Sequence, residues 1–444
     1  MSRLFEWGQQ TADGPTLMPT VKVSGVAGAI LFFCAMLLLQ GRNFEKLYDS
    51  SQHDLRAYLA CAHNIVAGRH MYTTHHQAIP EDPTLTSDVP KYLYPPLLGM
   101  LMIPTTVFSY DTFKHIWFFL NFLFLFHGIF LAVTLLPFGR FRSTAFFLVS
   151  AVFVGSDILP WLLRTAQADG FVIWMSTVSL WLFHRQKWLA SAILISAAAW
   201  IKVTPGLFFV YMITRGNLRF TLWAAASGLM LGLVQFGAFP DEFRYFFTDT
   251  ISNEMPSPMQ PPVMQSLWSL AKVLVVPWRG RSVFDAPEQF ESVLLWMKIG
   301  VAVFTGAVLL RKRTGADDLL LGFAVCCSAS LLITDISWIM RFIWSFISTA
   351  ALLFVATTAQ RWWTKALFVP LCVFAILLNM GMLWKGAFEP LTEWRAIFIA
   401  GPALHALFST VFLGTLCMIK SEWIWPIQKG VAFLRTTTAR LNKS

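Results

Sequence analysis

The sequence predicts an all-α polytopic membrane protein, and three observations carry that prediction. Hydrophobic residues make up 56% of the 444 residues and charged residues only 13%, whereas soluble domains contain about 25% charged residues. The mean hydropathy is +0.59. Apolar windows of about 20 residues, the length that crosses the hydrocarbon core, recur to the end of the chain. Because no polar stretch is long enough for a separate soluble domain, we expect 1–444 to form a single integral membrane domain.

The apolar runs indicate a bundle of about 11–13 transmembrane helices, some of them broken. Two pieces, 205–214 and 266–277, are too short to cross unaided. Pro205 should end the preceding helix just after Lys202. Non-helical backbone at membrane depth is tolerated only where it lines a cavity or is buried in protein, so we expect a cavity near Lys202. The candidate spans are 22–40, 92–110, 114–136, 143–160, 170–184, 188–203, 205–214, 218–238, 286–310, 317–334, 338–359, 364–384 and 395–419.

Basic clusters give the expected orientation in a plasma (inner) membrane. They lie at the ends of apolar runs, the positive-inside pattern of cytoplasmic loops, so the net charge of +10 indicates no nucleic-acid partner. This leaves 42–91 as an outer catalytic loop, 239–285 as a second outer loop with a re-entrant or interfacial segment, and 421–444 as a basic cytoplasmic tail. Arg140 and Arg142 conflict with this scheme: either 92–110 does not cross fully, or both arginines break the rule.

The first outer loop contains the residues best suited to catalysis. Asp54–Gly68 has the pattern of a short amphipathic helix, with Asp54 at its start and Gly68 at its end. Asp54 is either an N-cap or a general base beside His53 and Arg56, and one residue can be both. Tyr94, at the entry of a span, is either an interface anchor or part of the site. His70, His75 and His76 lack partners at metal-ligand spacing, and the six cysteines form no framework, so no metal or cofactor is expected.

Charged residues at membrane depth mark the rest of the candidate site. Lys202 either extends to the outer interface or binds a phosphate as a point charge. Gln167 and Asp169, with Arg164, belong to a neighbouring turn on the same face. Arg341 is either a second cation of the site or the ion-pair partner of Asp335. In the 239–285 loop, Glu254 and Gln265-Ser266 are either solvated or part of the site.

Taken in order, these residues resemble glycosyltransferase family 87, polytopic GT-C enzymes that include polyprenyl-phosphate-mannose-dependent mannosyltransferases. The resemblance covers roughly 45–345. Three elements differ from the family pattern. Where the family has Gly-Gln-x-Asn, this chain has Ala166-Gln167-Ala168-Asp169. Met264 replaces an asparagine, and Met340-Arg341 occupy positions where histidines are usual. The matching elements are Asp54-x3-Tyr58, Gly68-x3-Tyr72, Tyr94-Pro95-Pro96 with Pro104, Gln167, Lys202-Val203-Thr204-Pro205, Gln265-Ser266-Leu267 and Ile336-Ser337-Trp338.

The resemblance implies an inverting, metal-independent transfer of a hexose, with mannose the best-known precedent, from a polyprenyl phosphate to a glycan or glycolipid on the outer face. It implies that Asp54 is the catalytic base. We expect Lys202 and Arg341 to meet the donor phosphate. The expected substrate-binding residues are His53, Arg56, Tyr58, Tyr94, Gln167, Asp169, Gln265, Ser266 and Trp338. Two other functions stay open, a lipid-linked sugar flippase or transporter and an O-antigen-type polymerase or ligase. A transporter usually has repeated halves, and none is visible.

Overall fold

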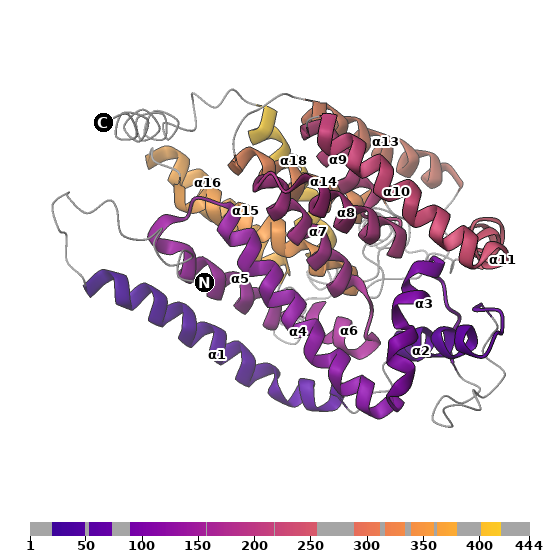
Figure 1. Ribbon diagram of the computed structural model, residues 1–444. Coiled ribbons are helices and arrows are strands. Elements are labelled where there is room, and N and C mark those ends of the chain that lie inside the picture. Colours follow the sequence, from indigo (N-terminus) through magenta and orange to yellow (C-terminus); the bar gives the residue numbers. More distant parts are fainter. Residues whose placement is uncertain are drawn as a thin grey trace, which may run out of the picture.

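The computed structural model describes residues 20–48, 53–72, 89–156, 158–216, 218–254, 288–310, 316–333, 339–358, 362–379 and 401–418. The regular elements in these ranges are all helical (Figure 1). Together with the apolar character of the helices, this confirms the prediction of an all-α polytopic membrane protein.

The first half of the chain supplies the elements around the candidate site. The long α1 packs on α5 and α6, while α4, α7, α8 and α10 pack on one another in that order. The elements are α1 (Thr20–Tyr48), α2 (His53–Val66), α3 (Pro96–Met102), the 3-10 helix η3 (Ile103–Val107), α4 (Tyr110–Leu135), η4 (Gly139–Phe141), α5 (Arg142–Val154), α6 (Ile158–Thr165), α7 (Asp169–His184), α8 (Trp188–Ile201), α9 (Gly206–Arg215), α10 (Leu218–Ala238), α11 (Pro240–Tyr245) and the π-helical η5 (Phe246–Glu254).

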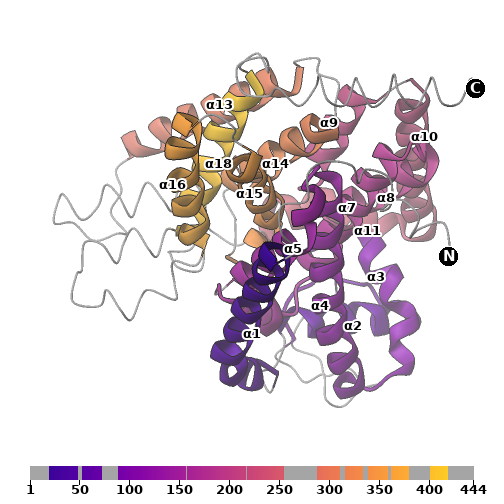
Figure 2. The same ribbon diagram turned by 90° about the vertical axis from the view of Figure 1, so that its left-hand side faces the viewer.

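The second half forms a packed group that leans on the first. α14 contacts α13, α15 and α18, and α15 also reaches α4 and α5. Figure 2 shows these helices gathered together, away from α2 and α3. One large hydrophobic core runs from α2 to α18 without a break between the halves. The elements are α13 (Glu288–Leu310), α14 (Ala316–Ile333), the 3-10 helix η7 (Ile339–Ser345), α15 (Phe346–Thr358), α16 (Trp362–Asn379) and α18 (Gly401–Met418).

Two described helices, Tyr110–Leu135 and Leu218–Ala238, are long and apolar enough to cross a membrane. α5 and α6 would add a third span if this bent pair crosses as one. The other apolar helical stretches among the described residues are 10–17 residues long. They are shorter than the roughly 20 residues that cross the hydrocarbon core unaided. The remaining spans of the expected 11–13 therefore stay a prediction. So do the single domain, the 42–91 and 239–285 loops and the 421–444 tail, parts of which lie outside the described residues.

The segment 92–110 does not form the continuous span that was a candidate. It contains α3 and η3, which end before the N-cap Ser109 of α4. Seven α-helical and five 3-10 residues extend about 20 Å, against a hydrocarbon core of about 30 Å. Both elements pack on α2 instead. Of the two alternatives, this favours the one in which 92–110 does not cross fully, and the cytoplasmic location of Arg140 and Arg142 stays a prediction.

The predicted loop helix exists as α2, with one correction at its start. It begins at His53, so Asp54 lies in the first turn rather than at the N-cap, where its carboxylate still favours the free N–H groups of that turn. The predicted stop at Gly68 is confirmed, because Gly68 has a φ of +67°. Arg69 N–H donates to Asn64 O at 2.8 Å and Gly68 N–H to Ile65 O at 3.1 Å, the bonds of a Schellman motif.

Candidate functional site

A buried ion pair lies at the break between α8 and α9. α8 ends at Ile201, Lys202 is extended, and Pro205 precedes α9, as the sequence predicted. Lys202 Nζ lies 2.7 Å from Asp169 Oδ2 and 3.5 Å from Gln167 Oε1. Lys202 is 8% exposed and Asp169 0%. A charge this deeply buried is stable only when it is paired, so Asp169 is what holds the ammonium group inside.

The turn that carries Gln167 and Asp169 is anchored on three sides. Ala166 has a φ of 55°, a left-handed conformation that costs a non-glycine residue free energy. Trp117 Nε1 of α4 donates to Ala166 O at 2.8 Å. Trp344 Nε1 of η7 donates to Asp169 O at 3.3 Å. Ala168 N–H donates to the Tyr58 hydroxyl of α2. The surrounding helices therefore determine where the Asp169 carboxylate points.

A pair of tyrosines connects this turn to α2. Tyr58 Oη accepts from Ala168 N–H at 3.1 Å and donates to Tyr94 Oη at 3.0 Å. Lys202 Nζ lies 5.4 Å from the centroid of the Tyr94 ring, close enough for a cation–π interaction. Burial, as the first cause, raises the pKa of Tyr58 well above its ordinary value, and the nearby Tyr94 and Asp54 raise it further. The Tyr58 hydroxyl is therefore neutral at physiological pH and remains a donor.

Arg341 supplies a second buried cation. It belongs to η7, three residues before Trp344, and is 8% exposed. Its charge acts on both Tyr94 and Lys202, which places it in the same site. Its Nε and Nη1 atoms have no hydrogen-bond partner in the described part of the chain. Asp169 Oδ1 is likewise buried without one. The two Arg341 nitrogens can donate to an anion, and Asp169 Oδ1 can accept from a hydroxyl group. These atoms therefore suit a ligand that carries both an anion and hydroxyl groups.

Asp54, half-buried in the first turn of α2, is the second carboxylate of the site. Its charge acts on Tyr58, Tyr94 and Lys202. It is more accessible than Asp169, which has no exposed surface. A carboxylate that solvent reaches and that lies near the Lys202 ammonium group is suited to accept a proton from an incoming hydroxyl group.

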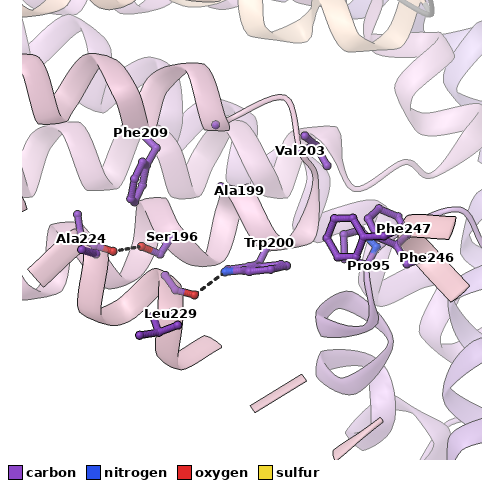
Figure 3. Close-up of a pocket in the computed structure, with 13 residues that line it drawn as sticks. Pro95, Ser196, Ala199, Trp200, Val203, Phe209, Ala224, Leu229, Phe246 and Phe247 are labelled. Carbon is purple, nitrogen blue, oxygen red and sulfur yellow. Dashed lines mark hydrogen bonds between the residues drawn. The ribbon is translucent and has the colours of Figure 1, made fainter. Parts of the chain in front are cut away.

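An apolar cavity of about 500 Å³ is lined in part by the break between α8 and α9. Two of its lining residues, Pro95 and Val203, directly follow Tyr94 and Lys202 in the chain. The Trp200 indole donates to Gly228 O at 2.8 Å, so this polar atom does not face the cavity as a free donor (Figure 3). None of the lining residues is charged, so the expected cavity around Lys202 itself stays a prediction. Pro95 and Val203 line the apolar cavity from the segments before α3 and α9. The other lining residues come from α8, α9, α10 and η5: Ser196, Ala199, Trp200, Gly206, Phe209, Ala224, Ala225, Gly228, Leu229, Phe246 and Phe247.

The structure brings most of the predicted site residues together at one end of the bundle, where α2, α3 and α11 lie in Figure 1. Arg56 is half-buried, and its charge acts on Tyr110 at the start of α4. The side chain of His53 is outside the described residues, as are Gln265, Ser266, Asp335 and Trp338. The residues that meet around the ion pair are Asp54, Tyr58, Tyr94, Gln167, Asp169, Lys202 and Arg341.

Three residues that support the site were missed from the sequence. Trp117 and Trp344 hold the backbone of the 166–169 turn, and Gln235 of α10 accepts from Leu97 N–H at 2.9 Å, at the start of α3. The chain has 19 tryptophans, and indole groups are ordinary at membrane interfaces. Nothing local therefore distinguishes these two. A glutamine within an apolar run was the one available signal for Gln235.

Comparison with known proteins gives two matches. The model of glycosyltransferase family 87 matches residues 92–334, a stretch that contains the ion pair but neither Asp54 nor Arg341. The chain is also 24% identical over 270 residues to the polyprenol-phosphate-mannose-dependent alpha-(1-2)-phosphatidylinositol pentamannoside mannosyltransferase of Mycobacterium tuberculosis. The similarity covers 58% of this chain and 58% of that relative, so the chain spans less than two thirds of the length of the relative.

Proposed function

Because the chain belongs to glycosyltransferase family 87, we propose that it transfers a hexose from a polyprenyl phosphate to a hydroxyl group. The proposed sugar is mannose, since the mycobacterial relative is named for polyprenol-phosphate-mannose. The acceptor is a lipid-linked or cell-envelope glycan. The reaction proceeds with inversion on the outer face of the plasma membrane.

The observation that supports this function most is the placement of two buried cations beside an apolar cavity. Arg341 presents two buried nitrogens that have no partner among the residues the structure describes, and Lys202 adds its charge from the ion pair. The cavity begins at Val203, the next residue. A polyprenyl phosphate has the matching chemistry, an anion directly attached to a long apolar chain. We assign its phosphate to Arg341 and Lys202 and its first isoprene units to the cavity.

The reaction follows from these positions. Asp54 accepts the proton of the acceptor hydroxyl, whose oxygen forms a bond to the anomeric carbon from the side opposite the phosphate. The bond between that carbon and the phosphate oxygen breaks, and its electron pair leaves with the polyprenyl phosphate. Arg341 and Lys202 stabilise the charge that develops on this leaving group. Asp169 Oδ1 is placed to accept a hydrogen bond from a sugar hydroxyl. Atoms and charge balance without a cofactor.

Asp54→Asn is the direct test, because asparagine keeps the shape of the side chain but cannot accept the proton. Membranes that contain the protein are incubated with radiolabelled polyprenyl-phosphate-mannose and the acceptor lipids of the host. We expect the rate of transfer to fall by about 100-fold or more, the usual contribution of a general base. Donor binding should stay near the wild-type value.

Asp111→Asn is the matched control. Asp111 is an exposed aspartate in the first turn of another helix, α4, and its substitution should leave transfer unchanged. Full transfer by Asp54→Asn would refute the assignment of the base. If label only changed leaflet in wild-type membranes and no new product formed, the protein would be a flippase and the proposed function would be wrong.

A further inference from the structure

Tyr58 has a position that its expected role as a substrate contact does not explain. It lies one turn after Asp54 on α2, on the same side of the helix. Its exposed fraction is 0%, the same as that of Asp169, so burial by itself does not distinguish the two. Its hydroxyl is occupied within the protein by Ala168 N–H and Tyr94 Oη. The role of Tyr58 must therefore be exerted through other residues.

Both hydrogen bonds of Tyr58 lead to Lys202 by short routes. Ala168 directly precedes Asp169, whose carboxylate holds the ammonium group at 2.7 Å. Tyr94 carries the ring that lies 5.4 Å from the same ammonium group. The Tyr58 hydroxyl thus contacts Tyr94 directly and reaches Asp169 through the amide of the preceding residue, while its own helix carries Asp54.

We propose that Tyr58 is a positioning residue that fixes the distance between Asp54 on α2 and the Lys202–Asp169 ion pair. This proposal rests on the proposed function, in which the two ends of that distance serve the acceptor hydroxyl and the leaving phosphate. The attacking oxygen and the leaving group must lie on opposite sides of one carbon atom, so a small error in the distance between them slows the reaction strongly. Burial of the hydroxyl keeps both bonds out of exchange with water.

The test is Tyr58→Phe, which keeps the ring and removes only the hydroxyl. If Tyr58 acts by positioning, kcat should fall about 10-fold or more, while the KM for the donor changes by less than about 3-fold, because the donor contacts remain. Tyr211→Phe is the matched control. Tyr211 is also fully buried and donates to a backbone carbonyl, Leu319 O, at 2.8 Å, but on α9 and away from the site. The Tyr211→Phe protein should lose as much thermal stability as Tyr58→Phe and keep the wild-type kcat.

A double-substitution cycle distinguishes positioning from a general loss of stability. If Tyr58 acts through the ion pair, adding Tyr58→Phe to Lys202→Gln should reduce kcat far less than it does in the wild-type protein. Equal fold-losses in both backgrounds would overturn the proposal. So would a Tyr58→Phe enzyme with wild-type kcat.

Hydrogen exchange gives a readout that does not depend on the reaction. The amide of Ala168 loses its acceptor in Tyr58→Phe, so a peptide that spans residues 166–170 should exchange faster than in the wild-type protein and in Tyr211→Phe. Unchanged exchange would contradict the proposal even if activity fell. Absence of transfer by the wild-type protein would instead count against the proposed function, and the exchange experiment would still test the role of Tyr58.

Discussion

The three buried charges of the site are unequally satisfied. Lys202 is held by Asp169 Oδ2, whereas Arg341 Nε, Arg341 Nη1 and Asp169 Oδ1 have no hydrogen-bond partner among the described residues. A buried polar atom without a partner costs about 1–3 kcal/mol. Such atoms persist where they have a functional use. A bound polyprenyl-phosphate sugar would supply a hydrogen-bond partner to each of these three atoms. We therefore expect Arg341, rather than the already paired Lys202, to be the principal cation for the incoming phosphate.

Substitution of Arg341 should therefore weaken donor binding more than any other change to a single cation. A charge-assisted hydrogen bond contributes about 1.5–3 kcal/mol, which corresponds to a roughly 10–100-fold increase in the donor KM for Arg341→Gln. Arg341→Lys should recover part of this loss, since it restores the charge but not the planar pair of donors. Steady-state kinetics at varied polyprenyl-phosphate-mannose concentration provide the measurement.

Arg164→Gln is the control for this series. Arg164 lies in the last turn of α6, two residues before the 166–169 turn, but it is exposed and lies over the Trp161 ring, 5.2 Å from its centroid. Its removal should leave the donor KM within about 2-fold of wild type, as for most exposed charges. If Arg164→Gln raised the donor KM as much as Arg341→Gln, the effect would be one of net charge, and Arg341 would have no specific role.

At the scale of elements, α2 is positioned by its two ends. Its start carries Asp54, and its end is closed by the Schellman motif at Gly68. After this turn the chain reaches Tyr72, whose hydroxyl donates to Tyr94 O at 2.8 Å. The C-terminal cap of α2 therefore directs the chain back toward the tyrosines of the site. A change in the backbone at Gly68 would alter the position of those tyrosines.

Gly68→Ala isolates this effect, because a Cβ at Gly68 would meet no atom within 4 Å. The only penalty is the φ of +67°, which disfavours alanine by about 1 kcal/mol. We expect a small decrease in thermal stability and faster hydrogen exchange at the end of α2. Gly28→Ala, equally free of contacts but inside α1, should be neutral or stabilising because alanine favours helix. A stabilised Gly68→Ala would contradict the assigned turn.

At the scale of the whole molecule, the bundle places an apolar cavity against a polar site. The cavity wall is formed by α8, α9, α10 and η5, and its polar atoms are bonded within the wall. Four separate elements must pack to enclose it. A long isoprene chain can extend from such a cavity into the surrounding lipid, so donors with longer chains should be used better than short, water-soluble ones.

Filling the cavity should remove this preference. Gly228 of α10 lines the cavity, and the nearest atoms to a Cβ there are 3.9 and 4.0 Å away, so leucine would extend into free space. In Gly228→Leu, we expect the ratio of kcat/KM between long-chain and short-chain donors to fall by about 10-fold or more. Gly237→Leu, on the same helix but outside the cavity, should keep the wild-type ratio. An unchanged ratio in Gly228→Leu would place the isoprene chain elsewhere.

The sequence by itself determined the features that depend on neighbouring residues. Apolar length predicted the helices, Pro205 predicted the break after Lys202, and Gly68 predicted the end of α2. The structure agrees on the break at Pro205 and on the end of α2 at Gly68, whereas 92–110 forms two short helices in place of one span. These are consequences of local backbone chemistry, so a short window of sequence is enough. The resemblance to the family added Asp54 as the expected base, a role that local sequence could not separate from a helix cap.

Only the tertiary structure decided which polar groups meet. Lys202 pairs with a carboxylate 33 positions away, Tyr58 with an amide 110 positions away, and Asp169 with an indole 175 positions away. Hydrophobic burial has no direction and brings the helices together in many ways. The pairing of buried polar atoms depends on the one arrangement in which those helices finally pack. The sequence therefore specified a carboxylate and a cation at this end of the molecule, and the fold made them an ion pair beside an apolar cavity.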